Sequence, residues 1–147
     1  MDEIKSQEAG EEARLRRALF TLLQKCPLIP DTVSVKYGEA AENAVGIFSQ
    51  KGDKRITKQF VSGAYEAQFP FLLRYMTVPS TDDDRIGAEE LLAGIADWLC
   101  GAQVYPVLSE NRQIVKIEAG NVYSEKKQED GTISYEVTMN MKYTKGR

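Results

Sequence analysis

Residues 68–99 decide the fold of this chain and read QFPFLLRYMTVPSTDDDRIGAEELLAGIADWL. From about Ala64 to Val78, every second residue is expected to face the protein core, which is the period of a β-strand. The core-facing side would carry Tyr65, Ala67, Phe69, Phe71, Leu73 and Tyr75. After a polar break, apolar residues recur at helical spacings of three and four: Ala88, Leu91, Leu92, Ile95, Trp98 and Leu99. The stretch therefore predicts a long strand followed by an amphipathic helix that ends at Gly101.

Pro70 stands inside the expected strand, although proline has no backbone N–H to donate to a sheet. Proline within a strand is typical of an edge strand or of a bulge. We therefore expect either a local break near Phe69–Phe71 or a free sheet edge there.

Three aspartates, Asp82–Asp84, begin the expected helix, and Ser80 or Thr81 can cap it. A calcium-binding loop would need oxygen ligands at its positions five and twelve. Counted from Asp82, those positions hold Ile86 and Ala93, so the loop pattern fails. The aspartates are better explained as anions at the positive end of the helix dipole, and no metal site is predicted.

Upstream of this stretch, a first helix is expected from about Gln7 to the cysteine before Pro27, and residues 1–6 are expected to be flexible. Its apolar stripe consists of Leu15, Ala18, Leu19, Leu22, Leu23 and Cys26. Three short strands should follow, at residues 33–37, at residues 44–48, and at residues 56–61, where the chain would pair back on itself as a hairpin arm.

Downstream, two more strands are expected on either side of a charged turn that ends in Asp130-Gly131. In the strand at residues 114–122, Val115, Ile117 and Ala119 should share one face. In the last strand the shared face consists of Ile133, Tyr135, Val137, Met139, Met141 and Tyr143. The sequence thus predicts a single α+β domain over residues 1–147, in the order α-β-β-β-β-α-β-β. Two helices would cover one face of an antiparallel or mixed sheet.

The composition excludes several classes of protein. The chain has 147 residues, of which 42% are hydrophobic and 28% charged, as in an ordinary globular domain. Its net charge of −3 gives no general attraction for nucleic acid. No apolar run approaches the roughly 20 residues that span a bilayer, and the first residues lack a secretory signal. We expect a soluble protein that is made in the cytoplasm and has no membrane partner.

The residues of common active sites are missing. The chain contains no histidine, so Ser-His-Asp and Cys-His nucleophile systems and most catalytic zinc sites are excluded. Neither a phosphate-binding glycine loop nor a dinucleotide fingerprint occurs. Cys26 and Cys100 match no metal-binding spacing and are expected to be reduced thiols, with a disulfide between the helix ends as the alternative. We expect no enzyme activity, no cofactor and no metal.

A basic cluster consists of Lys51, Lys54, Arg55 and Lys58. It could contact phosphate or DNA. It could equally be a solvated turn, because no aromatic residue is interleaved for base stacking. A third interpretation is a salt-bridged subunit contact with acidic partners such as Glu39, Glu42 or the aspartates at 82–84.

The 68–99 stretch also resembles a known family. Phe69-Pro70 within a strand, the aromatic residues that follow it, and an acidic helix closing on Ile95-Ala96-Asp97-Trp98-Leu99 are the matching features. They are similar to those of minor capsid or tail-terminator-like proteins, which are encoded in the head–tail joining modules of tailed phages and prophages of Gram-positive bacteria. The resemblance covers about a fifth of the chain, and its motifs are structural.

The resemblance implies a structural protein of a virion or phage-like tail particle. Such subunits form a ring, commonly a hexamer, that ends the tail tube and joins it to the neck or head connector. The expected partners are further copies of the chain, a tail tube or sheath protein and a neck or connector protein, with DNA passing through. The Pro70-bearing strand and the 114–143 hairpin are the candidate subunit contacts, represented by Phe69, Pro70, Arg74, Met141 and Tyr143. The alternative function is a nucleic-acid-binding accessory protein that uses residues 51–58.

Overall fold

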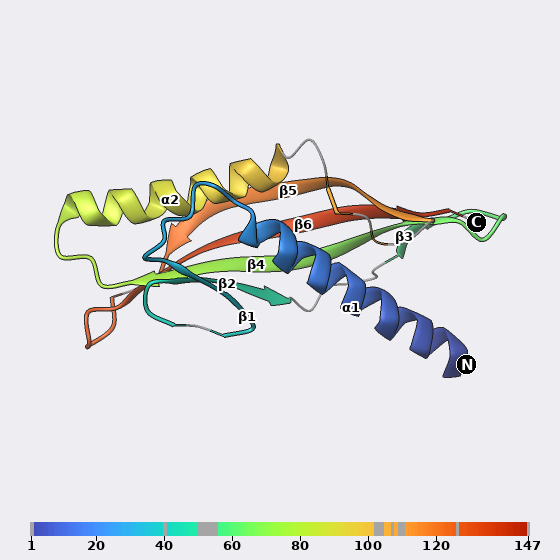
Figure 1. The fold of residues 1–147 in the computed structure, drawn as a ribbon, viewed down its shortest axis with the longest axis horizontal. Coiled ribbons are helices and arrows are strands. Elements are labelled where there is room, and N and C mark those ends of the chain that lie inside the picture. The colour runs from blue at the N-terminus through green and yellow to red at the C-terminus, as the bar shows by residue number, and fades with distance from the viewer. Residues whose placement is uncertain are drawn as a thin grey trace.

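The computed structural model describes residues 2–39, 41–49, 56–101, 105–106, 108, 111–125 and 127–146, with side chains from residue 13 onward. Within these residues the chain follows the predicted order α-β-β-β-β-α-β-β (Figure 1). The elements are α1 (Asp2–Gln24), β1 (Ser34–Tyr37), β2 (Ala44–Ser49), β3 (Ile56–Gln59), β4 (Tyr65–Thr77), α2 (Asp82–Cys100), β5 (Arg112–Ser124) and β6 (Ile133–Lys145).

The described strands form one mixed sheet in the order β1-β2-β4-β6-β5. β1 runs parallel to β2, and all other pairs are antiparallel. The last strand, β6, lies in the middle of the sheet, where it pairs with β4 over thirteen positions from Tyr65↔Lys145 to Thr77↔Ile133. β5 is the terminal strand on one side. The α+β class and the mixed sheet are therefore confirmed.

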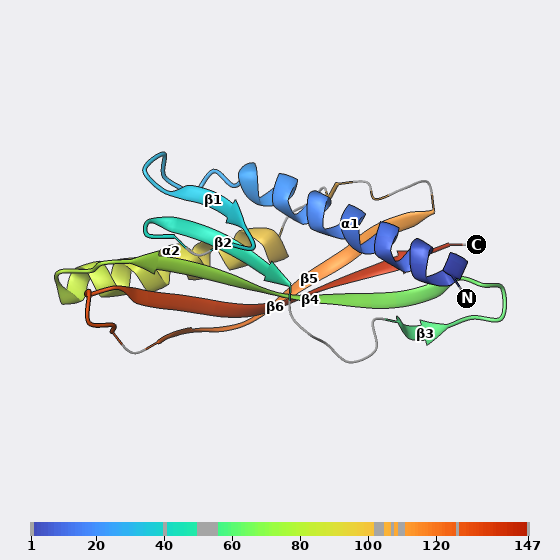
Figure 2. The same cartoon turned by 90° about the horizontal axis from the view of Figure 1, so that it is seen from below.

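Both helices pack on the same face of the sheet, as predicted. Figure 2 shows α1 running along one side of the long strands β4 and β6. The core that both helices share with the odd-numbered residues of β4 and β6 includes Leu19, Leu23, Leu92, Ile95, Leu99, Phe71, Leu73, Tyr135, Val137, Met139 and Met141. The even-numbered residues of β4 and β6 lie on the opposite face, which no helix described here covers. We call it the open face.

The two helices differ slightly from expectation. α1 already begins at Asp2, so it includes most of the residues that were expected to be flexible. Thr81 is the N-cap of α2, since its side chain accepts from the Asp84 N–H at 3.1 Å, and Gly101 ends the helix by donating to the Asp97 carbonyl. Trp98 is half-buried beside the core.

Both cysteines are free thiols, so the alternative disulfide does not form. Cys26 is buried after α1, and Cys100 is half-buried at the end of α2. Burial raises the pKa of each thiol. Both cysteines are therefore expected to remain protonated near neutral pH and to react slowly.

Pro70 lies in a continuous strand, and not at a break. β4 is central to the sheet, but two strands share its edge on the side away from β6. β3 pairs with residues Tyr65–Ala67, and β2 pairs with residues Phe71–Met76. No described strand pairs with β4 between these partners, and Pro70 falls in that interval. Among the described residues, Pro70 therefore has a strand partner on one side only, which agrees with the free-edge alternative; residues 50–55, which connect β2 and β3, lie outside the described residues.

The predicted pairing of residues 56–61 was wrong. β3 does not fold back on β2, and instead pairs with the start of β4 through the turn at Ser62-Gly63. Gly63 has a φ of +95°, a left-handed conformation that favours glycine. β3 and β4 therefore form a hairpin at one end of the sheet (Figure 1).

The predicted face of β5 was also wrong in part. The β5–β6 register shifts between Ile114 and Lys116, and again between Ala119 and Val122. The first shift puts Ile114 and Ile117 on the core side, whereas Val115 is 51% exposed. Such bulges are common in edge strands, and each one interrupts strict alternation.

Candidate interaction surfaces

Three of the five predicted contact residues are not available to a partner. Phe69, Met141 and Tyr143 are 6%, 0% and 1% exposed and belong to the core beneath the helices. They share the helix-covered face because β4 and β6 pair with Phe69 opposite Met141. This corrects the predicted contact set, since these side chains already pack within one chain. Pro70 and Arg74 lie on the open face, and their role in assembly stays a prediction.

Arg74 belongs to a polar cluster on the open face. One row across the sheet contains Gly46 of β2, Arg74 of β4, Glu136 of β6 and Tyr123 of β5. The Arg74 Nε donates to Glu136 Oε1 at 2.7 Å, and the Tyr123 hydroxyl donates to Glu136 Oε2 at 2.5 Å. Glu125 Oε1 lies 4.0 Å from the Arg74 guanidinium. The cluster thus ties three neighbouring strands together.

Glu136 is an unusual residue for a sheet surface, because it is only 3% exposed. Burial opposes its ionisation, but hydrogen bonds from Tyr123 and Arg74 outweigh burial and hold its pKa below the ordinary value of 4.5. The contact with Glu136 raises the pKa of the nearby Glu125 carboxyl. The cluster therefore holds one firmly ionised carboxylate, Glu136, beside a second that ionises less readily.

Phe48 completes the cluster from the apolar side. The Arg74 guanidinium carbon lies 5.2 Å from the centre of the Phe48 ring, a cation–π distance. Gly46 lies next to Phe48, and a side chain there would come within 2.8 Å of the Glu39 carbonyl oxygen. This arrangement fixes the guanidinium in place and leaves a mixed polar and apolar surface. Nothing in it resembles a nucleophile paired with a base.

The basic cluster is described only in part. Lys51, Lys54 and Arg55 lie outside the described residues. Lys58 is exposed on β3, and its amino group lies 5.1 Å from the centre of the Phe60 ring. Phe60 is 42% exposed, and Val61 beside it is fully exposed. The β3–β4 hairpin therefore presents apolar side chains next to a positive charge.

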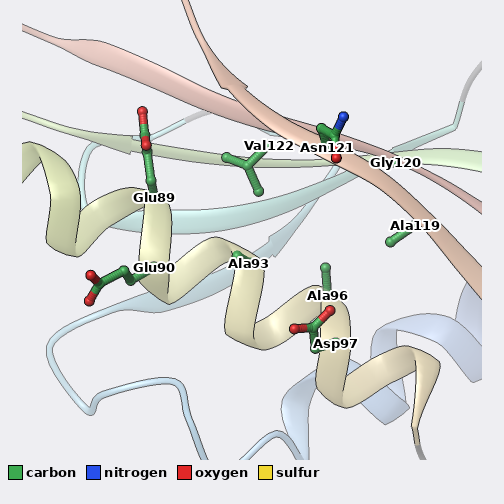
Figure 3. Close-up of a pocket in the computed structure, with 9 residues that line it drawn as sticks. All are labelled: Glu89, Glu90, Ala93, Ala96, Asp97, Ala119, Gly120, Asn121 and Val122. Carbon is green, nitrogen blue, oxygen red and sulfur yellow. The ribbon is translucent and has the colours of Figure 1, made fainter.

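A groove lies between α2 and β5 (Figure 3). It is lined on α2 by Glu89, Glu90, Ala93, Ala96 and Asp97, and on β5 by residues 119–122. Its volume is about 450 Å³. We call it the acidic groove, because three carboxylates lie along its helix wall.

The groove and the Glu136 cluster both escaped the sequence analysis. Glu136 alternates with the core residues of the last strand, a pattern that predicts only an outward-facing polar side chain, and its partner Tyr123 lies beyond the expected end of the preceding strand. The acidic groove depends on β5 being the terminal strand, which the order of elements along the chain does not reveal.

The described residues also limit other kinds of site. They contain no group of three or more acidic or cysteine side chains that could hold a metal ion. Neither described helix is long and apolar enough to cross a membrane.

Comparison with known proteins supports the fold assignment. No protein-family model matches the sequence, and no curated protein matches it. Among solved structures, the chain is similar to one from the "Virion of native gene transfer agent (GTA) particle". The TM-score is 0.62, and the alignment covers 90% of this chain and 95% of that chain at 16% sequence identity. The two chains therefore share a fold over nearly their whole lengths.

Proposed function

We propose that this protein is a structural subunit of a phage or phage-like particle. It would form a ring, most simply of six copies, that terminates the tail tube and joins it to the neck or head connector. The observation that carries the proposal is the fold shared with a chain of a gene transfer agent virion over 90% of this chain. The resemblance of residues 68–99 to tail-terminator-like proteins supports the same role independently of that comparison.

The chemistry of the described surfaces is consistent with assembly. A ring subunit needs two different contact surfaces that complement each other, because each copy contacts one neighbour through the first surface and the other neighbour through the second. Among the described strands, β5 has an unpaired outer edge, and the β3–β4 hairpin has an apolar tip at Phe60-Val61. It would act without catalysis or a cofactor. Its partners would be copies of itself, a tube or sheath protein and a neck protein, in a particle assembled in the bacterial cytoplasm.

The proposal is tested by deleting the gene from the genome that encodes it and inducing particle production. A missing terminator should leave tail tubes without heads, with lengths that vary widely in negative-stain images. Supplying the wild-type gene in trans should restore joined particles of uniform tail length. Mass spectrometry of purified particles should then detect the protein at a few copies per tail.

A matched control separates this role from a role in the head. A deletion that leaves full-length tails of normal length, with defective or absent heads, would contradict tail termination. Particles that assemble normally without the protein would contradict any structural role.

A further inference from the structure

The acidic groove has the geometry of a site for an extended peptide. Figure 3 shows the side chains of Val122 of β5 and Ala96 of α2 both extending into the space between the strand and the helix. β5 is the terminal strand of the sheet, so its outer edge has no partner among the described strands. The second bulge of β5, between Ala119 and Val122, lies in the groove itself. An edge of this kind can accept an added strand through its backbone N–H and C=O groups.

The charge of the groove indicates what kind of segment it would accept. Glu89, Glu90 and Asp97 are exposed, and no described lysine or arginine forms an ion pair with any of them. Three unpaired carboxylates along one wall would repel an acidic strand and attract a basic one. A cationic extended segment is therefore the complementary occupant.

The chain itself contains such a segment. Residues 51–58 read KGDKRITK, with four cations and one aspartate. The strands flanking this region, β2 and β3, both pair with β4 on the side away from β6 and β5. Lys58 on β3 and the acidic groove beside β5 thus lie on opposite sides of one sheet, and residues 51–55 lie outside the described residues. A contact between them would join two copies head to tail.

We propose that the acidic groove between α2 and β5 binds residues 51–58 of a second copy of this chain, and that this is the contact that closes the ring. The inference rests on the proposed function and specifies its subunit interface. It makes Lys58, together with Lys51, Lys54 and Arg55, a ligand of the neighbouring subunit's carboxylates. The contact is heterologous, so repeating it can close a ring or extend a filament.

Charge exchange tests the pairing. One variant carries Glu89→Lys, Glu90→Lys and Asp97→Lys, and the other carries Lys54→Glu, Arg55→Glu and Lys58→Glu. Each alone places like charges at every contact, so each should sediment as a monomer at concentrations where the wild type forms rings. An equimolar mixture should restore rings, because every contact then pairs opposite charges when the two variants alternate. A single chain carrying all six changes should also assemble alone.

A matched control changes the same charge elsewhere. Asp31→Lys and Glu129→Lys alter two exposed carboxylates outside both the groove and the β3–β4 hairpin and should leave assembly unchanged. Circular dichroism melting curves confirm that each variant is folded. If mixing the two groove and segment variants fails to restore rings that the wild type forms, the proposed contact is wrong while the proposed function stands.

Cross-linking decides the case in which the purified protein does not assemble without a tail tube. A photoreactive benzoylphenylalanine replaces Asn121 in the groove, and a mixture of ¹⁴N- and ¹⁵N-labelled chains is used. Irradiation of concentrated protein and of complete particles should join Asn121 to residues 51–61 of a differently labelled chain. A cross-link to the tube or neck protein instead, or none between chains in either sample, overturns the inference. If neither rings nor a tail-length defect on deletion is observed, the proposed function is wrong as well.

Discussion

Arg74 and Glu136 face each other on neighbouring strands β4 and β6, and the Arg74 Nε donates to a Glu136 carboxylate oxygen at 2.7 Å. The carboxylate is nearly fully buried although it lies on the face that no described helix covers. Its burial is tolerated because Arg74 and Tyr123 both donate to it. The pair is therefore more than an exposed ion pair and should contribute measurably to stability.

We expect Arg74→Ala to lower the free energy of unfolding by about 2 kcal/mol, because it leaves a buried carboxylate without its charged donor. Urea denaturation at pH 7 measures the change. Arg85→Ala is the control. The ion pair of Arg85 with Asp82 is exposed, so that change should cost less than about 1 kcal/mol. Equal losses from the two substitutions would contradict the special role of the Arg74–Glu136 pair.

The two carboxylates of the cluster should give opposite pH dependences. The folded-state pKa of Glu136 is lowered, so its ionised form stabilises the protein above pH 4.5, and this contribution is lost as the pH falls through the folded-state pKa. The pKa of Glu125 is raised, so its contribution is present below pH 4.5 and is lost as the pH rises through the folded-state value.

Glu125→Gln should consequently stabilise the protein at pH 7, because it removes a like charge beside Glu136 and supplies an amide N–H donor that an ionised carboxylate lacks. The advantage over wild type should shrink as the pH falls through the raised folded-state pKa of Glu125, and it should be gone below about pH 4.5, where the wild-type Glu125 is protonated in both the folded and unfolded states. Urea denaturation across this range measures both. Glu129→Gln, on an exposed turn, makes the same charge change as a control. If the stability advantage of Glu125→Gln were the same at every pH, the raised pKa of Glu125 would be refuted.

Gly46 and Gly87 should respond to alanine in opposite directions. A methyl group at Gly46 would lie 2.8 Å from the Glu39 carbonyl oxygen, so Gly46→Ala should cost about 1–3 kcal/mol. Gly87 is in α2 with open space around it, so Gly87→Ala should stabilise by about 0.5–1 kcal/mol. Thermal melting of both variants compares them. A loss of stability at both positions would show that the space around Gly87 is overestimated.

The bulge in β5 should appear in a comparison of Ile117 and Val115. Ile117 is 3% exposed and faces the core, so Ile117→Ala should cost about 3 kcal/mol. Val115 is half-exposed, so Val115→Ala should cost less than about 0.5 kcal/mol. Strict alternation would place both residues on the core side and predict similar losses. Chemical denaturation of the two variants distinguishes these cases.

The parts of the fold that follow local periodicity were predictable from the sequence. The stripe of α2 from Ala88 to Leu99 and the alternation of β6 from Ile133 to Tyr143 both mark buried faces correctly. Each signal depends on neighbours in the chain and on a single repeating geometry. The class, the order of elements and the helix-covered face followed from these signals.

Features that depend on partners distant in the sequence were not predictable. The bulges of β5 depend on its register with β6, which shows in no local pattern. The pairing of β3 with β4 is local, but the sequence offers two candidate turns, one before β3 and one at Ser62-Gly63, and no local pattern shows which of them forms the hairpin. Phe69 and Met141 were expected at a subunit interface because the strands that carry them were expected there. In the structure both side chains lie on the helix-covered face and belong to the core.

The interval that holds Pro70 has a consequence for the solubility of the protein. Where a strand edge has no neighbour, a strand from another molecule can pair with it, and this is how many folded proteins begin to form fibres. Proline cannot donate a backbone hydrogen bond to an incoming strand. No described strand other than β6 pairs with residues 68–70 of β4, so Pro70 should hinder amyloid-like growth there while subunits accumulate before assembly.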